Sequence, residues 1–412
     1  MEIGPASGSD ARPRGYVIIM MLLLCIATFC EGYDFFIISL VIDILPGEFG
    51  VSMNYVIKVV LTLINVGAIL GFFVIRLGDR FGRKPILLIS LCGFTTFSVI
   101  TAMSPSIWVF MAAQFIAKMF LVSQFGTAIV MTIEECPAKS RATCVALLQV
   151  AGGLGGAFAM IISKNILPVW GWRGMYWAGG APLILAPALV LLIKETAHFS
   201  ALKAAGAAAP PSLWHIWKTP SRKYVPAVGA IWFLGYLAYA GVIYFWVAFA
   251  KTERGWTVDQ VGPAMAVAAV VGMTGYIVSG VMMDKIGRKL TGVIFFTAGA
   301  ASLVWAFNAA GAMMLPSVVV SMFFIFAILP ITSTFNAELF PTELRSNAAA
   351  WCNSLMGRPA QVAAPFIVGS IAGVAGGLGT AVSFLAIGPL AAALMIAFLL
   401  PETKGVDLDK LL

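Results

Sequence analysis

Long apolar stretches follow one another along almost the whole chain and constrain its fold more than any other feature. A helix needs about 20 mostly apolar residues to cross the hydrocarbon core of a bilayer. Because the runs are continuous rather than alternating, and only helices or closed barrels satisfy their backbone in lipid, the sequence predicts an all-α membrane protein with twelve transmembrane helices. The twelve runs lie near residues 16–40, 55–77, 85–103, 106–131, 142–163, 174–193, 224–249, 261–283, 290–309, 313–336, 346–371 and 376–400.

The composition excludes the soluble classes of protein. Apolar residues make up 60% of the 412 residues and charged residues 11%, whereas soluble domains have about 45–50% and about 25%. The net charge of +8 does not indicate nucleic-acid binding, because the basic residues lie in short loops between apolar runs. We expect a multi-pass protein of the cell membrane (the inner membrane if its source is bacterial), with the lipid bilayer around it and no nucleic-acid partner.

The basic residues predict the orientation of the helices. If the N-terminus is cytoplasmic, nineteen Lys and Arg residues fall in cytoplasmic loops and tails, and five fall near the outer side, at 58, 164, 173, 251 and 254. Positive side chains concentrate on the cytoplasmic side of membrane proteins. We therefore expect both ends of the chain in the cytoplasm.

Loop motifs repeat at nearly one spacing and indicate a duplicated six-helix unit. GDRFGRK at 78–84 recurs as MDKIGRK at 283–289, which places Asp79 and Asp284 205 residues apart. Duplicated bundles of this kind occur in carriers whose halves rock around a central site. Two further pairs have offsets of 204 and 207 residues: Glu134, Pro137 and Arg141 with Glu338, Pro341 and Arg345, and Glu195-Thr196 with Glu402-Thr403.

One long polar connection divides the chain. It covers residues 196–222, is rich in Ala, Pro, Lys and Trp, and follows the sixth apolar run. We predict an N-terminal six-helix bundle at 1–195, a partly helical cytoplasmic linker at 196–222 and a C-terminal six-helix bundle at 223–412. Because one chain holds both halves, it is expected to work as a monomer.

These motifs resemble those of the major facilitator superfamily (MFS), over essentially the whole chain. Both loop repeats match the family's D-R/K-x-G-R-R/K signature, and ELFPTELR (338–345) and PETKG (401–405) are similar to the sugar-porter and metabolite:proton symporter branches. Glu31-Gly32-Tyr33-Asp34, GWRGMYW (171–177) and Gly357-Arg358 resemble the aromatic acid:proton symporters. The resemblance implies two pseudo-symmetric six-helix bundles, the MFS fold.

Two carboxylates in the first apolar run are the candidates for proton coupling. Glu31 and Asp34 are three residues apart and therefore share one face of a helix. Two such groups in a cavity of low dielectric do not both ionise easily, so one is expected to hold a proton near neutral pH. No histidine falls in a run that could take this role. A structural ion pair, or a position near the outer water interface, is the alternative, and the sequence does not say which acid carries the proton.

A third charge, Arg358, lies within the eleventh run. Ionisable groups inside a membrane are costly and tend to mark substrate or ion pathways. A guanidinium can hold a carboxylate with two parallel hydrogen bonds, and Asn353 and Gln361 make part of the same run polar. Substrate binding and a salt bridge to an acid that locks one conformation are both open interpretations.

The fourth run departs from the family pattern. Gln114 stands where the family has Arg, and Lys118 stands where it has Gly, which moves a positive charge by about one helical turn. Lys118 either contributes to the substrate site or pairs with Glu31 or Asp34, and such a pair would break when the acid is protonated.

Aromatic residues are dense in the seventh run. Tyr236 and Tyr239 are candidates for stacking on a ring-shaped ligand. For Trp232 and Trp246, near the ends of the run, we expect roles in the interface belt and in packing.

The repeated loop motifs predict a cytoplasmic gate. An acidic residue at one helix end can cap a neighbouring helix and pair with Arg across the cytoplasmic seam, and the family resemblance implies that this stabilises the outward-open state. Positive charge that only sets topology is the alternative for some of the basic residues. The gate candidates are Asp79, Arg80, Arg83, Glu134, Arg141, Asp284, Arg288, Glu338 and Arg345.

The sequence therefore predicts a secondary active transporter, not an enzyme. We expect proton-coupled symport of a small organic anion, an aromatic or other carboxylate, by alternating access, with protons and that substrate as its partners. No metal or cofactor is expected, because the six cysteines contain no CxxC pair and no nucleotide motif occurs. Sugar or polyol uptake with protons, drug efflux and a membrane sensor without transport are the alternatives.

Overall fold

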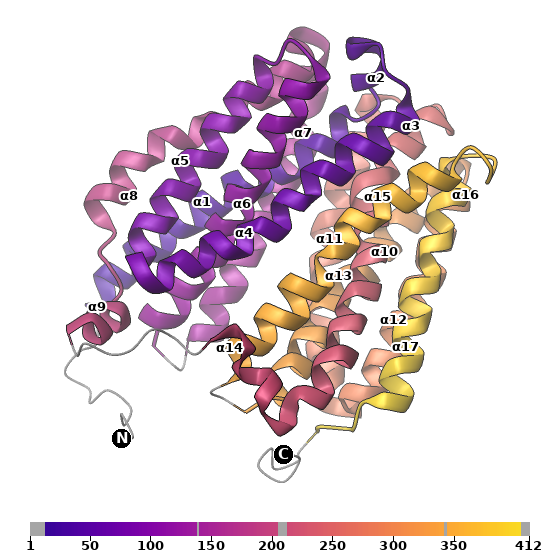
Figure 1. The fold of residues 1–412 in the computed structure, drawn as a ribbon. Helices are drawn as coiled ribbons and strands as arrows, with labels where there is room; N and C mark the ends of the chain where they lie inside the picture. Colours follow the sequence, from indigo (N-terminus) through magenta and orange to yellow (C-terminus); the bar gives the residue numbers. More distant parts are fainter. Residues whose placement is uncertain (1–12, 138–139, 205–211, 342–343, 405–412) are drawn as a thin grey trace.

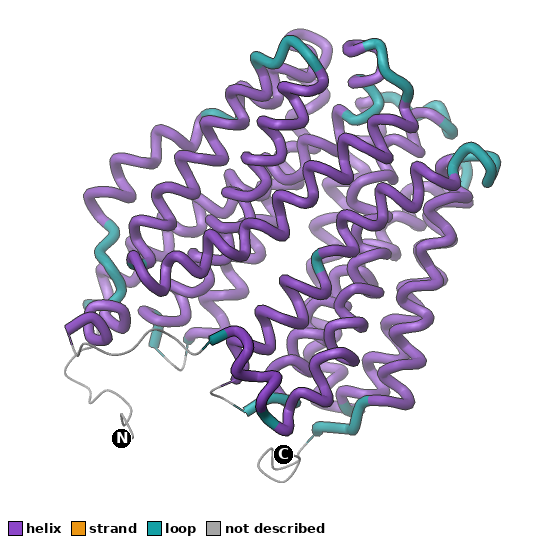
Figure 2. Tube along the Cα trace, viewed as in Figure 1, coloured by secondary structure: helices purple, strands orange, loops and turns teal. Residues whose placement is uncertain are grey.

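The chain is described here as a computed structural model, which covers residues 13–137, 140–204, 212–341 and 344–404. Within these ranges the chain is helical and contains no strand (Figure 2). The all-α class predicted from the continuous apolar runs is therefore confirmed.

The first part of the chain forms nine α-helices, one π-helical segment (η1) and one 3-10 segment (η2). They are α1 (Arg14–Val41), α2 (Leu45–Phe49), α3 (Met53–Tyr55), η1 (Val56–Leu61), α4 (Thr62–Phe81), α5 (Arg83–Ala102), α6 (Ile107–Glu135), α7 (Arg141–Ala178), η2 (Ala181–Leu185), α8 (Ala186–Leu192) and α9 (Ala197–Ala204).

The second part repeats this pattern of long helices and short interruptions. Its π-helical segment, η7, lies between two α-helices in the eleventh expected run. The elements are η3 (Leu213–Lys218), η4 (Pro220–Tyr224), α10 (Val225–Thr252), α11 (Val258–Ile286), α12 (Arg288–Asn308), η5 (Gly311–Met313), α13 (Met314–Glu338), α14 (Arg345–Ala348), η7 (Ala349–Gly357), α15 (Pro359–Ile371), α16 (Leu378–Ser383), η8 (Phe384–Ala386) and α17 (Ile387–Leu399).

Ten helical stretches of the described chain are long and apolar enough to cross a membrane. One of them, 143–192, is 50 residues long and covers nearly all of two expected runs, 142–163 and 174–193. The expected run 346–371 is not among the ten, and it begins with the four-residue α14 followed by η7. The number twelve and the cytoplasmic position of both ends stay predictions.

The break expected between the fifth and sixth runs is a kink at Gly171. The two runs leave residues 164–173 between them, and within this interval α7, which extends to Ala178, departs from helical geometry at Gly171, where φ is 61°. The short polar stretch at 163–165 does not end the helix, because backbone hydrogen bonds continue through it. Glycine adopts this positive φ without the steric penalty that a side chain brings.

The helices form two groups that meet along a central seam (Figure 1). In the first group α1 packs on α7, and α6 packs on α4 and α5. In the second group α13 packs on α11 and α12, and α17 packs on α10 and α12. Helices α7 and α11, α4 and α15, and α1 and α10 join the groups. The domain boundaries at 195 and 222 stay predictions.

A glycine run allows α1 and α7 to approach closely. A Cβ on Gly32 would overlap the backbone carbonyl of Gly152, and one on Gly155 would overlap the carbonyl of Phe29. Gly153 instead faces Met273 of α11 in the other group. These glycines therefore form close-packing surfaces, both within the first group and across the seam.

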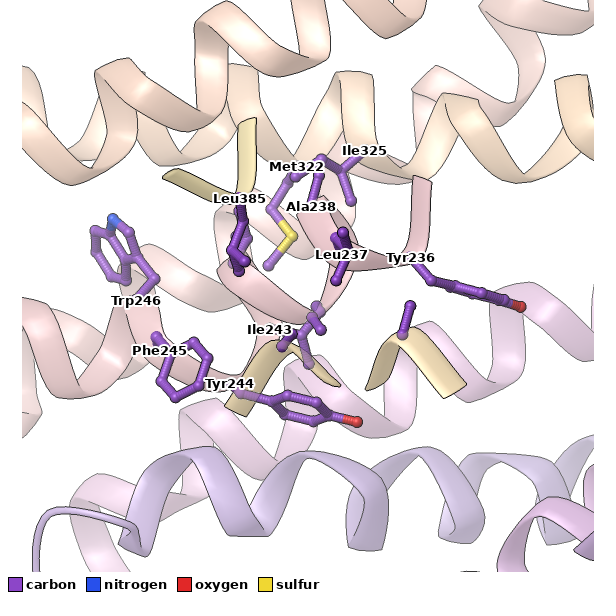
Figure 3. Packing of buried hydrophobic residues seen from close by; sticks show 14 of the residues in the cluster. Tyr236, Leu237, Ala238, Ile243, Tyr244, Phe245, Trp246, Met322, Ile325 and Leu385 are labelled. Atoms are coloured by element: carbon purple, nitrogen blue, oxygen red, sulfur yellow. The ribbon is translucent and has the colours of Figure 1, made fainter. Parts of the chain in front are cut away.

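Of the interface and packing roles expected for Trp232 and Trp246, the structure shows packing and not an interface position. Trp232 is 4% exposed and Trp246 is fully buried. Figure 3 shows Trp246 beside Phe245 in the packing around α10. Because 20 of the 28 residues of α10 are buried, most of this helix faces protein rather than lipid, so nearness to a helix end did not place these rings in the interface.

Candidate functional site

Two buried acids lie on α1 where it packs against α7. Glu31 is 8% exposed and Asp34 is 5% exposed. Close helix packing positions them, since the Glu31 Oε2 atom lies 3.7 Å from where a Cβ on Gly152 would be. Both acids are therefore enclosed by protein.

The two acids have different polar surroundings. Asp34 Oδ1 accepts a hydrogen bond of 2.5 Å from the Ser98 hydroxyl of α5. Glu31 makes no hydrogen bond or ion pair in the described part of the chain, although the charges of Lys118 and Arg358 act on it. Ser98 was not among the predicted site residues, because one hydroxyl in an apolar run carries no distinctive signal.

Lys118 brings a positive charge from α6 into the same region. Its side chain is 6% exposed, and Nζ lies 3.6 Å from the centre of the Phe35 ring, a cation–π contact. One turn earlier, Gln114 Nε2 donates to the Thr101 hydroxyl over 3.0 Å. The ammonium forms no ion pair with Glu31 or Asp34 in this conformation, although the charges of both act on it.

A small cavity of about 10 Å³, room for roughly one water molecule, lies at these residues. Three of the predicted site residues line it, together with side chains from α1, η1, α4, α6 and α10. Arg358, Tyr236, Tyr239, Asn353 and Gln361 do not belong to its wall. The lining residues are Asp34, Phe35, Ile38, Leu61, Ile64, Asn65, Gln114, Lys118, Leu121 and Tyr244.

A hydrogen bond crosses the seam at this cavity. The Tyr244 hydroxyl of α10 donates to Asn65 Oδ1 of α4 over 2.8 Å, and Asn65 Nδ2 donates to the Leu61 carbonyl. In Figure 3 the Tyr244 hydroxyl points away from Met322 and Leu385. Asn65 was not among the predicted site residues, although a single amide inside an apolar run is a signal that could have identified it.

Arg358 stands at the junction of η7 and α15. Its side chain is partly buried and makes no hydrogen bond or ion pair to a described residue, but its backbone N–H donates to the Asn353 carbonyl over 2.9 Å. Asn353 Oδ1 in turn accepts from the Tyr236 hydroxyl over 3.0 Å. Arg358 acts electrostatically on Glu31 and Lys118.

The remaining candidates of this group are packed nearby. Gln361 is 3% exposed and its Oε1 has no hydrogen-bond partner among the described residues. The Tyr239 ring lies 5.9 Å from that of Tyr236 and 6.4 Å from that of Phe326. Tyr239 therefore belongs to an aromatic cluster, and Tyr236 links this cluster to Asn353.

The first gate motif closes into an ion cluster. The Arg83 guanidinium lies 2.5 Å from Asp79 and 3.1 Å from Glu134. Glu195 accepts from the backbone N–H of Arg83 over 2.8 Å and so caps α5, while the Thr196 hydroxyl donates to Glu134 over 2.6 Å. The third loop repeat, which we had not assigned to the gate, thus completes it.

The second gate motif repeats this arrangement residue by residue. Arg288 lies 3.3 Å from Asp284 and 3.0 Å from Glu338, and the Thr403 hydroxyl donates to Glu338. Glu402 accepts from the backbone N–H groups of Arg288 and Lys289. Burial acts to raise the pKa of Glu402, but the four backbone amides around its carboxylate hold that pKa below its usual value.

Glycine permits the tight turn in both motifs. Gly82 has φ 107° and Gly287 has φ 99°. A Cβ on Gly287 would lie 2.5 Å from Glu402 Oε2. The glycine of the motif is therefore required both by its backbone conformation and by the approach of the capping carboxylate.

The other gate candidates lie outside these two clusters. The Arg80 guanidinium lies 5.4 Å from the centre of the Phe81 ring, and Arg345 Nε donates to the Phe340 carbonyl over 3.4 Å. The Arg141 side chain lies outside the described residues. Arg83 bonds within the first group and Arg288 within the second.

Metal-binding geometry is not found in the described chain, where no group of three His, Cys, Asp or Glu side chains could hold an ion. The arrangement instead places two acids, one ammonium and one guanidinium in the interior of a helical bundle. Such groups can exchange protons and bind an anion, which is chemistry suited to transport.

Comparisons with known proteins agree with this fold. The family model of the Major Facilitator Superfamily matches residues 24–365. The chain is 25% identical to the niacin transporter of Acinetobacter baylyi over 81% of this chain and 82% of that protein, and 23% identical to the gallate transporter of Pseudomonas putida over 94% and 93%.

Among solved structures, the inward-open xylose transporter XylE of E. coli is similar in fold. It has a TM-score of 0.75 and 19% identity, covering 96% of this chain and 99% of that one. This likeness concerns the fold alone. With the family match over most of its length, the chain is a multi-pass membrane protein that belongs to the Major Facilitator Superfamily, a family of transporters and not of enzymes.

Proposed function

We propose that this transporter couples proton movement to the uptake of a small organic anion, an aromatic or other carboxylate, by alternating access. The observation that carries the proposal is the set of three interior charges, Glu31, Lys118 and Arg358, none of which forms an ion pair with a described residue. An unpaired charge inside a membrane protein is costly and is retained where it has a functional role. A carboxylate substrate offers a partner to the two cations.

The charge balance of the site supports symport rather than simple anion binding. With both acids ionised, Glu31 and Asp34 compensate Lys118 and Arg358. An incoming carboxylate adds one negative charge, which protonation of one acid removes. Binding of the anion and binding of a proton therefore favour each other, and this reciprocal coupling is what a symporter requires.

The names of the similar proteins point to the same class of substrate. Niacin and gallate are the substrates named for the transporters of A. baylyi and P. putida, and both are aromatic acids. The aromatic cluster around Tyr236 and Tyr239 lies beside Asn353 and offers rings for stacking.

Contacts between the two groups of helices support an inward-open state. Asp43 and Lys251 form an ion pair across the seam, and at the same end a Cβ on Gly262 would lie 2.5 Å from the Met160 carbonyl. The arginine clusters at the opposite end pair within their own groups. We propose that these clusters meet across the seam when the transporter opens outward.

The proposal is tested by uptake into liposomes containing the purified protein, with nicotinate and gallate as anions and xylose as a neutral comparison. We expect anion uptake driven by an inward proton gradient and no uptake of xylose. Arg358→Lys should weaken anion uptake and Arg358→Ala should abolish it. If xylose is taken up and the anions are not, or if Arg358→Ala impairs xylose uptake alone, the organic-anion assignment is wrong.

A further inference from the structure

The linker is attached to the helix that carries Arg358. Trp351 Nε1, in η7, donates a hydrogen bond of 2.8 Å to the Leu213 carbonyl in the linker segment η3. Asn347 Nδ2, in α14, donates to the Ser212 carbonyl over 3.3 Å. Two side chains from one helix thus bond to consecutive backbone carbonyls of a segment more than 130 residues earlier in the chain.

Aromatic packing reinforces these bonds. The Trp351 ring lies 5.0 Å from the Trp214 ring and 5.2 Å from the Trp217 ring, edge to face in both cases. Ile216, between the two linker tryptophans, is fully buried. The segment 212–218 therefore holds the beginning of η7 by a defined contact, not only by the course of the chain.

The π-helical register of η7 extends to Arg358. The Arg358 N–H bonds to the carbonyl five residues earlier, that of Asn353, whereas an α-helix would use the carbonyl of Ser354. Since each residue of an α-helix turns the chain by about 100°, a change of this register would turn the Arg358 side chain by a similar angle. π-helical segments inside membrane helices often mark functional sites.

Contacts with α10 hold the other end of η7. Asn353 bonds to Tyr236, and a Cβ on Gly357 would lie 2.8 Å from the Trp232 Cβ. The register is thus held between α10 on one side and the linker on the other. Trp351 is the residue that joins η7 to the linker.

We propose that Trp351 is a positioning residue for substrate binding: by bonding to the linker it holds the π register of η7 and so directs the Arg358 guanidinium to the anion. This inference rests on the proposed function of Arg358. It gives the linker a role at the binding site beyond that of a tether between halves.

The test compares Trp351→Phe, which keeps an aromatic ring but removes the donor, with Trp170→Phe at a tryptophan that is 72% exposed. In liposomes with nicotinate as probe, Trp351→Phe should raise KM about three- to tenfold, the effect of one lost hydrogen bond, with Vmax within about twofold. Trp170→Phe should change neither. In a background of Arg358→Lys, Trp351→Phe should have little further effect, because both changes act on one contact.

A purely structural role for Trp351 predicts a different result. Trp351→Phe would then lower thermal stability, leave KM of the folded protein unchanged, and lower the uptake rate by the same factor in the native and Arg358→Lys backgrounds. That result would overturn the proposal. If Trp351→Phe does not fold, Asn347→Ala removes the second bond to the linker and should raise KM in the same direction. An unchanged KM in Asn347→Ala would then contradict the proposal.

A second measurement separates this inference from the proposed function. Amide hydrogen exchange of residues 349–358 needs no substrate, and it reports whether the register holds. Faster exchange in this segment for Trp351→Phe than for Trp170→Phe, with α13 unchanged, supports the linker contact even if nicotinate is not transported. Equal exchange in the two variants contradicts it, whatever the substrate is.

Discussion

The Lys251 ammonium lies 2.6 Å from the Asp43 carboxylate, and this ion pair joins the end of α10 to the chain just after α1. Both side chains are 14% exposed, so water screens the pair less than a surface pair. Because Asp43 and Lys251 belong to different groups of helices, the ion pair can form only when the seam is closed at this end. The pair therefore stabilises that closed state.

Breaking this pair should open the seam. We expect Asp43→Asn to shift the population toward an outward-open state by about fivefold, as loss of about 1 kcal/mol implies. Spin labels at Asn54→Cys and Val374→Cys, on exposed positions of the two groups, would show a longer distance. The control is Glu48→Gln, which breaks the Glu48–Arg173 pair within one group and should leave the distance distribution unchanged; an equal change in both variants contradicts the assignment.

Packing between α1 and α7 should tolerate no side chain at Gly32. We expect Gly32→Ala to destabilise the protein by at least the 1–3 kcal/mol typical of overpacking, because the new methyl group would overlap the Gly152 carbonyl. Gly280→Ala is the matched control, since a Cβ there meets nothing within 4 Å. Thermal unfolding followed by fluorescence measures both, and equal melting temperatures would show that the helices can move apart at little cost.

The hydrogen bond between Tyr244 and Asn65 should contribute to coupling between the halves. Tyr244→Phe removes the donor alone, and polar pairs in membrane interiors contribute about 0.6 kcal/mol on average. A double-mutant cycle with Asn65→Ala, read by thermal unfolding, should give an interaction energy of this size. Tyr276→Phe serves as a control, because the Tyr276 hydroxyl makes no hydrogen bond in the described chain. An interaction energy of zero would show that this hydrogen bond does not couple the two halves.

Acid should remove the contribution of Glu402 to stability. The pKa of this carboxylate is lowered in the folded protein by backbone amides, so its stabilisation is present above the unfolded pKa of about 4.3 and is lost as the pH falls through the lower folded value. We expect Glu402→Gln to lower the free energy of unfolding at pH 7 by less than about 1 kcal/mol, because solvent screens this carboxylate. Its melting temperature should be lower than that of the native protein. The difference in stability between the native protein and Glu402→Gln should shrink below about pH 4.3. A difference that grows in acid would contradict a lowered pKa for Glu402.

Much of the fold can be predicted from the sequence, because local patterns of residue type determine where the helices and the repeated loops lie. The continuous apolar runs predict helices, and the loop repeats mark the residues that cluster around Arg83 and Arg288, although each cluster pairs within its own group and not across the seam. Glu195 and Glu402 were visible as a repeat, but their role as helix caps depends on the return of the chain to the start of a neighbouring helix. No local sequence pattern indicates this long-range contact.

Interior details depend on contacts between distant residues and were not predicted. The burial of Trp246 follows from the central place of α10, and the partner of Asn65 lies 179 residues away. The π-helical register before Arg358 depends on the linker and on α10 together. These features arise from tertiary packing, which overrides the preference of a residue type for an interface or a regular helix.

The most direct test of the account is whether anion entry carries protons through Glu31 and Asp34. Liposomes containing the protein and an internal pH-sensitive dye should acidify when nicotinate is added outside, and the double variant Glu31→Gln/Asp34→Asn should lose this acidification while still exchanging internal for external nicotinate. Acidification that persists unchanged in the double variant would contradict proton coupling through these two acids.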